Sequence, residues 1–361
     1  MKAPSCCSRL PPAHADASSE PSSSKAPLRS QLLPSFLSRR AVAKSPKEQS
    51  EQLRNRLQEL ATQRSGAYPL NYDYSVSTQA NYSAAPGQSD SHVGPYAKIR
   101  ASLDSTYHGI YMPARQRLQD RLIARTLATG SAQKKPWLIF TAGPMGAGKS
   151  HVVQWMYERG TFLVDKLVHC DPDLLRSALP EWAGYVARDP LTAGALTHRE
   201  AGLLVEIATE AALRAGAHVW VDGSLKDSVW YRGAISDVRR RYPHYSIAIL
   251  EVHARPERIF ERVARRAADT GRDVPREEVL DAIERVPKSV AALCDLCDFS
   301  AMIDNSDATP RLTKYCDADC CYVTRSSEED LTKGWDEIRN RFGLVQHGET
   351  IGVTTVKTSK L

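Results

Sequence analysis

The chain has 361 residues, enough for one large domain or two modest ones, and its 42% hydrophobic and 25% charged residues are ordinary for a soluble protein. No apolar stretch approaches the roughly eighteen residues that a membrane-spanning helix needs, so we expect no membrane span. The formal net charge is +6, but seven basic against two acidic residues place +5 of it within residues 1–45. The rest of the chain is nearly neutral, which argues against a nucleic-acid-binding protein.

Residues 1–45 are basic, of low complexity and rich in Ser and Pro. Their composition favours a disordered tail over an organelle transit peptide. Residues 46–112 are expected to form a helical and irregular extension, in which "SPKEQSEQLRNRLQELATQR" makes an exposed helix and a turn-rich connection follows. A firmer helix is expected from Pro113, and its aliphatic face should pack on the domain that follows. That face comprises Leu118, Leu122, Ile123 and Leu127.

From Trp137 onward, short apolar runs alternate with helical segments. The expected strands are "WLIFTA", "DKLVHCD", "HVWVDGS", "SIAILEVHA" and "FSAMIDN". Between and after them lie expected helices, namely one from Lys149, "THREAGLLVEIATEAALRAG", "WYRGAISDVRRRY", "PERIFERVARRAADTG", "PREEVLDAIERVPKSVAALCDL" and "EEDLTKGWDEIRNRFG". This alternation predicts a doubly wound α/β fold, with a parallel sheet covered by helices on both faces. The domain should span residues 113–345, followed by a tail over residues 346–361.

A glycine-rich turn, "GPMGAGKS", follows the first expected strand. It fits the phosphate-loop pattern G-x-x-x-x-G-K-[ST], in which backbone N–H groups and a helix N-terminus surround phosphates. Lys149 should reach the β- and γ-phosphates, and Ser150 should ligate Mg²⁺. The chain has no N-K-x-D motif of the kind that reads guanine in GTPases. A small kinase with ATP and Mg²⁺ as cofactors is the economical interpretation. The nucleotide-binding residues would be Gly143, Pro144, Met145, Gly146, Ala147, Gly148, Lys149, Ser150 and His151.

A kinase also needs a carboxylate that accepts the proton of the attacking hydroxyl. In α/β folds such groups lie at the carboxyl ends of strands. Asp171 and Asp173 follow one expected strand, and Asp222 ends another. Either of the first two could instead cap the helix that begins there. Asp222 could bind Mg²⁺ through water or serve only the turn before Gly223.

Five arginines crowd the segment after "LEVHA", and arginine is suited to neutralising a phosphoryl group in transfer. Most such arginines are solvated surface charges, so we expect only one or two to be functional. They are Arg258, Arg262, Arg265, Arg266 and Arg272.

The order of "GPMGAGKS", "DPDLLRSALP", "HVWVDGS", "LEVHARPE" and "RRAADTGRDVP" resembles the zeta-toxin family of P-loop kinases from about Trp137 to Leu312. The lead-in "YHGIYMPARQRLQDRLI" is similar to the helical entry of eukaryotic members. The resemblance implies a P-loop NTPase-type fold. It also implies transfer of a phosphoryl group from ATP, with Mg²⁺ as cofactor. Bacterial members of that family phosphorylate a sugar hydroxyl of UDP-N-acetylglucosamine in this way.

By position, the resemblance assigns Asp173 as general base and Lys149 as a catalytic phosphate ligand. It places Ser150 and Asp222 at the metal. Arg266 and Arg272 would contact the γ-phosphate, and the first of these positions could instead belong to Arg262 or Arg265.

Three departures from the family pattern leave the acceptor open. Leu179-Pro180 stands where members often have His-Pro, Asp222 is shorter than the usual Glu, and Ser224 replaces a Thr. We expect an ATP-dependent kinase acting on a hydroxyl of a small molecule, with a nucleotide sugar as one candidate. The alternatives are an ATP-binding regulator without transfer activity and a 5′-hydroxyl polynucleotide kinase.

Further side chains carry expectations of their own. Buried free thiols are favoured over a zinc site for the cysteines at positions 294, 297, 316, 320 and 321. His151 should face solvent, and core packing should account for Trp137, Trp220 and Trp230.

The chain ends in Ser359-Lys360-Leu361, a tripeptide that a receptor reads as a peroxisomal import signal. It predicts a peroxisome or related microbody, with the import receptor as a partner. A cytoplasmic protein is the alternative.

Overall fold

The computed structural model describes residues 45, 47–48, 51–52, 54–55, 72–84, 92–162, 167–270, 273–317, 321–324 and 328–342. Four expectations fall wholly or mainly outside these residues. They are the tail over residues 1–45, most of the exposed helix after it, Arg272, and the end of the chain with Ser359-Lys360-Leu361. The proposed domain boundaries therefore stay predictions.

Within the described residues, seven strands form one sheet in the order β2-β3-β1-β4-β5-β6-β7. The strands β1 to β5 pair in parallel, whereas β6 and β7 are antiparallel. Their bounds are β1 (Trp137–Ala142), β2 (Leu167–Cys170), β3 (His218–Asp222), β4 (Ser246–His253), β5 (Phe299–Asp304), β6 (Arg311–Asp317) and β7 (Cys321–Val323). The expected doubly wound α/β fold is confirmed.

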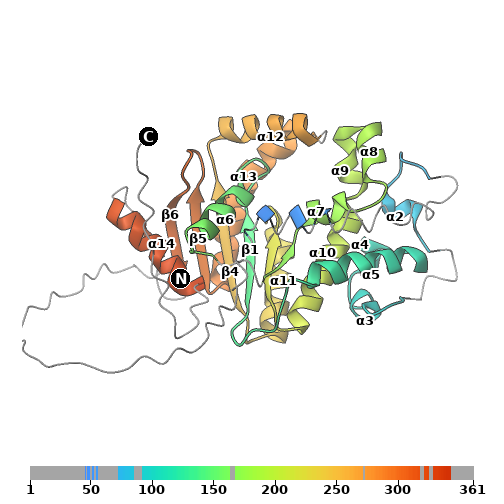
Figure 1. Ribbon diagram of the computed structural model, residues 1–361, viewed down its shortest axis with the longest axis horizontal. Helices are drawn as coiled ribbons and strands as arrows, with labels where there is room; N and C mark the ends of the chain where they lie inside the picture. Colours follow the sequence, from blue (N-terminus) through green and yellow to red (C-terminus); the bar gives the residue numbers. More distant parts are fainter. Residues whose placement is uncertain are drawn as a thin grey trace, which may run out of the picture. The chain divides into compact units, whose positions relative to one another are not determined.

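Helices connect these strands. The extension contributes α2 (Thr78–Asn81), α3 (Ala97–Arg100), α4 (Ser105–His108) and α5 (Pro113–Leu127). Next come α6 (Lys149–Glu158), α7 (Pro172–Ser177), α8 (Trp182–Arg188), α9 (Pro190–Leu196), α10 (His198–Arg214) and α11 (Ser228–Arg241). The last are α12 (Pro256–Thr270), α13 (Arg276–Leu293), the short 3₁₀ helix η1 (Cys294–Leu296) and α14 (Glu328–Phe342). In Figure 1, β6 and α14 lie at one end of the sheet and α7, α8 and α9 at the other.

The central strands bury both of their faces. In β1, Leu138 and Phe140 enter a core shared with α10, α11 and α13, whereas Ile139 enters a second core shared with α6 and α14. Because side chains alternate along a strand, one buried strand supplies both cores. This explains why the strand runs in the sequence are almost continuously apolar.

The helix expected from Pro113 is α5, with Pro113 in its first turn. Leu122 and Ile123 are fully buried against the first core, so the predicted packing onto the sheet domain is confirmed. The short helices α8 and α9 and the hairpin of β6 and β7 were not predicted. Their sequences mix polar and apolar residues without a clear period, so their structure depends on the neighbours that they pack against.

Two expectations about individual side chains are wrong. Cys316 and Cys321 lie opposite each other on β6 and β7 and form a disulfide, so they are not free thiols. Trp230, in the first turn of α11, is 48% exposed, so core packing does not account for it. Trp220 is a core residue as expected. None of the helices in the described part of the chain combines the length and the apolar character that a membrane crossing requires.

Candidate functional site

The glycine-rich loop lies where the order of the sheet reverses. From β1 the chain passes to β2 and β3 on one side of the sheet and then to β4 on the other, so the carboxyl end of β1 is the switch point at which α/β proteins bind ligands. Gly146 and Gly148 have φ angles of 87° and 88°. A β-carbon on Gly146 would lie 2.5 Å from the carbonyl oxygen of Ile259, and one on Gly148 would collide with the Asn305 amide. Both positions therefore require glycine.

The loop leads into α6, which begins at Lys149. The ammonium group of Lys149 donates a 3.0 Å hydrogen bond to the carbonyl oxygen of Gly143, so the lysine closes over the loop that precedes it. Ser150 follows in the first turn and is exposed. A helix N-terminus beneath a turn of glycines directs backbone N–H groups and a partial positive charge at one point. This arrangement suits an anion such as a phosphate.

Asn305 and Arg262 support the loop from behind. The Asn305 side-chain amide donates to the carbonyl oxygen of Ala147 at 2.8 Å, and Nη1 of Arg262 donates to the same oxygen at 3.2 Å. Nη2 of Arg262 donates to the Asn305 carbonyl at 2.9 Å. His151 is exposed as expected, and its Nδ1 lies 3.1 Å from the Asn305 side-chain oxygen. The described contacts of Arg262 are therefore with the backbone around the loop.

Asp171 and Asp173 have different partners. Oδ1 of Asp171 accepts hydrogen bonds from the backbone N–H groups of Asp173 at 2.7 Å and Leu174 at 3.3 Å, so Asp171 is the N-cap of α7. The carboxylate of Asp173 accepts from Arg176 and, at 2.7 Å, from Arg266. Its side chain is 29% exposed, so it can reach a bound molecule. Asp171 therefore caps the helix, whereas Asp173 pairs with the two arginines.

Asp222 is held by neighbours on the same sheet face. Thr141 donates a 2.6 Å hydrogen bond to Oδ1 of Asp222, and the Trp220 indole N–H donates to Thr141 at 3.2 Å. The ring of His169 stacks on Trp220 with centroids 3.8 Å apart. Asp222 therefore has a defined orientation at the end of β3.

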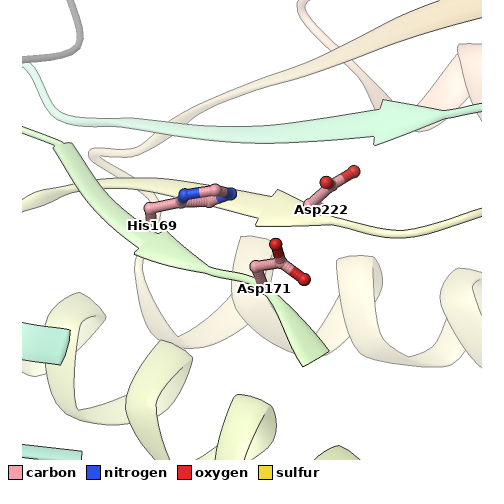
Figure 2. A group of neighbouring side chains, drawn as sticks. All are labelled: His169, Asp171 and Asp222. Carbon is pink, nitrogen blue, oxygen red and sulfur yellow. The ribbon is translucent and has the colours of Figure 1, made fainter. Parts of the chain in front are cut away.

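Figure 2 shows His169, Asp171 and Asp222 grouped near the carboxyl ends of β2 and β3. Each offers a ligand atom within 4.8 Å of those of the other two. Burial, together with the charges of Asp222 and Asp173, raises the pKa of Asp171. Burial lowers the pKa of His169 to about 4, although Asp222 opposes this. Two carboxylates crowded in this way favour a divalent cation between them, and oxygen ligands suit Mg²⁺.

The structure separates the arginines. Arg266 reaches Asp173, Arg262 supports the loop, Arg258 pairs with Glu261 at 2.9 Å, and Arg265 is exposed. Arg272, expected at the γ-phosphate, lies outside the described residues.

Four side chains of the site were missed from sequence, namely Thr141, His169, Arg176 and Asn305. Two of them had a usable signal. Asn305 directly follows a strand, and Arg176 lies one helical turn after Asp173, where side chains meet.

The chain matches a known protein family and is similar to several solved structures. Residues 120–310, more than half of the 361-residue chain, match the family described as "Zeta toxin". No curated protein sequence matches the chain.

Among solved structures, the chain is similar to one from the PezAT chromosomal toxin–antitoxin system of Streptococcus pneumoniae. The identity is 13% and the TM-score 0.46, over 65% of this chain and 98% of that one. It is also similar to an AvrRxo1-ORF1:AvrRxo1-ORF2 structure with sulphate ions, at 17% identity and a TM-score of 0.49, over 73% of this chain and 82% of that one. For a structure of this complex with ATP, the values are 15% and 0.44, over 73% and 81%.

Proposed function

The chain belongs to the zeta toxin family, and we propose that it transfers the γ-phosphoryl group of ATP to a hydroxyl group of a small molecule. Members of this family are ATP-dependent kinases. The observation that carries the proposal is the placement of Asp173. Its partly exposed carboxylate lies at the carboxyl edge of the sheet with Arg266 from another helix, and the phosphate loop opens at the same edge.

In the proposed reaction, the loop and Lys149 hold the phosphates of ATP. The hydroxyl oxygen of the acceptor bonds to the γ-phosphorus while the bond from that phosphorus to the β,γ-bridging oxygen breaks. The proton of the hydroxyl passes to the carboxylate of Asp173. Arg266 leaves Asp173 and donates to the γ-phosphoryl oxygens, where its planar group compensates the charge.

Mg²⁺ fits the oxygen donors of the site. Ser150 and Asp222 would hold it, directly or through water, with Asp171 close by. The ion would supply neutralisation of charge on the β- and γ-phosphates. Thr141 contributes by fixing the Asp222 carboxylate through its 2.6 Å hydrogen bond.

For the acceptor, we propose a nucleotide sugar, with UDP-N-acetylglucosamine as the first compound to test. This choice is what the sequence resemblance to the zeta-toxin family implies. Leu179, Asp222 and Ser224 differ from the family pattern. A nucleotide sugar with a different sugar or base therefore belongs in the same test.

The test is to incubate the purified chain with ATP, Mg²⁺ and a panel of nucleotide sugars and to search by mass spectrometry for a product heavier by one phosphate. A phosphorylated acceptor that is missing with Asp173→Asn supports the proposal. ATP binding without transfer to any member of a wide hydroxyl panel would contradict it and favour an ATP-binding regulator. Transfer to an oligonucleotide 5′-hydroxyl instead would favour a polynucleotide kinase.

A further inference from the structure

A buried ionic cluster lies beside the candidate site, and the reaction proposed above does not use it. Arg115 of α5 is 3% exposed and donates to two glutamates at once. Its Nη1 and Nη2 bind the Glu181 carboxylate at 2.9 and 3.1 Å, and its Nε and Nη2 bind the Glu200 carboxylate at 2.7 and 3.0 Å. Both carboxylates are at least as buried as the arginine.

Neighbouring side chains complete this cluster. The guanidinium of Arg115 lies 3.9 Å from the centre of the Tyr82 ring, and the Tyr82 hydroxyl donates to Glu181. Gln119 donates to Glu200 at 2.9 Å. Burial alone would lower the pKa of Arg115, but the charges and hydrogen bonds of Glu200 and Glu181 hold it well above its usual value. Arg115 therefore stays protonated in the folded protein, and its paired hydrogen bonds define the geometry of the cluster.

The two glutamates flank α8 and α9, the helices that follow α7. Glu181 immediately precedes α8, and Glu200 lies in the first turn of α10. Tight turns connect Glu181 back to α7. The backbone N–H of Trp182 donates to Leu179, and that of Leu179 donates to Arg176, each at 3.0 Å. A shift of Glu181 would therefore move the end of α7.

Side chains link the same residues a second time. The Arg176 guanidinium lies 6.0 Å from the centre of the Trp182 ring, and Arg176 donates to the Asp173 carboxylate. Arg176 is only 5% exposed, so its surroundings decide where it points. Contacts thus run without a gap from Arg115 through Glu181 and Trp182 to Arg176 and Asp173.

We propose that Arg115 is a positioning residue for the phosphoryl-transfer reaction. By binding Glu181 and Glu200 together, it holds α7 and α8 so that Arg176 presents the Asp173 carboxylate to the acceptor hydroxyl. The catalytic part of this inference rests on the proposed role of Asp173. Lysine cannot replace arginine here, because only the planar guanidinium can bind both carboxylates in this fork. A displacement of about 1 Å at a reacting group can cost roughly a hundredfold in rate.

The first experiment measures amide hydrogen exchange in Arg115→Lys and in a matched control, Arg241→Lys. Arg241 also holds a glutamate with two nitrogens, because its Nη1 and Nη2 bind the Glu210 carboxylate at 2.7 and 2.9 Å, but its described hydrogen bonds are with residues 210, 237 and 242. Arg115→Lys should accelerate exchange at least about tenfold over residues 174–185 and leave residues 152–156 of α6 unchanged. Arg241→Lys should leave both segments unchanged. Unaltered exchange over residues 174–185 in Arg115→Lys, or equal acceleration in α6, would overturn the positioning role.

The second experiment measures kinetics with MgATP and UDP-N-acetylglucosamine, or with the acceptor that the panel identifies. Arg115→Lys should lower kcat at least about tenfold while KM for ATP stays within about twofold. In an Asp173→Asn background, the same substitution should cause no further loss, because the group that it positions is gone. A further loss of activity in the double variant would show that Arg115 does not act through Asp173.

Glu181→Gln is a second variant in case Arg115→Lys folds poorly, and it should show the same exchange pattern. If the unsubstituted chain transfers no phosphate, the proposed function fails. The exchange experiment still decides whether Arg115 fixes the segment.

Discussion

Arg266 donates a 2.7 Å hydrogen bond to the carboxylate of Asp173, and this contact joins α12 to α7 across 93 positions of sequence. The two side chains are 45% and 29% exposed. Exposed ion pairs contribute at most about 1 kcal/mol to stability. Arg266 can therefore exchange the carboxylate for a phosphoryl oxygen at little cost. In the proposed reaction, Arg266 would pair first with the base Asp173 and then with the transferring phosphoryl group.

Substituting Asp173 tests the base directly. Asp173→Asn keeps the shape of the side chain but cannot accept the proton, so we expect transfer to fall by roughly a hundredfold or more. ATP affinity should change less than about threefold, because the described contacts of Asp173 do not involve the loop. Isothermal titration with ATP and a product assay measure the two quantities. Equal loss of binding and transfer would show that Asp173 is structural.

Arg266 can be compared with a neighbour on its own helix. Arg266→Ala should lower kcat by at least about a hundredfold, because the charge on the γ-phosphoryl group loses its partner. Arg258→Ala removes an arginine of similar exposure that pairs with Glu261, and it should leave kcat within about twofold. Steady-state kinetics of both variants give the comparison. A similar loss in the two would mean that the general positive charge of α12 matters, and not the position of Arg266.

The close packing at Gly148 can be tested by comparing it with Gly216, a glycine of similar backbone conformation. Gly148 and Gly216 have φ angles of 88° and 67°, but a β-carbon would collide with Asn305 only at Gly148. Both alanine variants should lose about 1–2 kcal/mol of stability, because each forces alanine into the left-handed region. Only Gly148→Ala should also weaken ATP binding, by at least about tenfold. Normal ATP affinity in Gly148→Ala would show that the loop tolerates displacement of Asn305.

The Mg²⁺ requirement should depend on Thr141. Thr141→Val removes the hydrogen bond that orients Asp222, so the Mg²⁺ concentration for half-maximal activity should rise about 10- to 100-fold. Thr126→Val is the control, because Thr126 is equally buried but its hydroxyl donates within α5, to Leu122. Activity of the unsubstituted chain should vanish with a chelator and return with Mg²⁺. An unchanged Mg²⁺ curve in Thr141→Val would argue against Asp222 as a ligand.

Glu251 predicts a pH dependence of stability. It lies in the central strand β4 with 4% exposure, and burial raises its pKa from 4.5 to about 7, although Lys314 opposes this. Because the folded value is the higher one, its contribution to stability is fully present below about pH 4.5 and is lost as the pH rises to about 7. Glu251→Gln cannot ionise and should escape this loss. Between pH 4.5 and 8, the unfolding free energy of Glu251→Gln should rise by roughly 2–3 kcal/mol relative to that of the unsubstituted chain.

Urea unfolding at several pH values measures this difference. Parallel stability curves for the two chains would mean that Glu251 titrates alike in the folded and unfolded states.

Much of the fold was readable from local patterns. Mostly apolar runs marked the buried strands β1 to β5, and the aliphatic face of α5 predicted its packing. The hairpin of β6 and β7 was missed because an edge strand with one partly exposed face lacks such a run. The disulfide was missed for a related reason, since Cys316 and Cys321 face each other only once β6 and β7 pair.

The candidate site also has one part that the sequence predicted and another that only the fold decided. The loop from Gly143 to Ser150 is contiguous, and its glycines and lysine act through local backbone geometry, so sequence alone located it. Whether Asp171 or Asp173 caps the helix stayed open, because both lie where that helix begins. Hydrogen bonds in the folded chain show that Asp171 is the cap and that Asp173 pairs with Arg266.

The sequence by itself determined the class of fold, the glycine-rich loop and the short set of acids and arginines that are proposed for a kinase site. These depend on periodicity, glycine positions and side-chain chemistry, which are properties of neighbouring residues. Only the tertiary structure decided that Arg266 meets Asp173, that Arg262 supports the loop, and that Arg115 joins Glu181 to Glu200. Such pairings follow from strand order and helix placement, which arise when distant segments bury their apolar faces against one another.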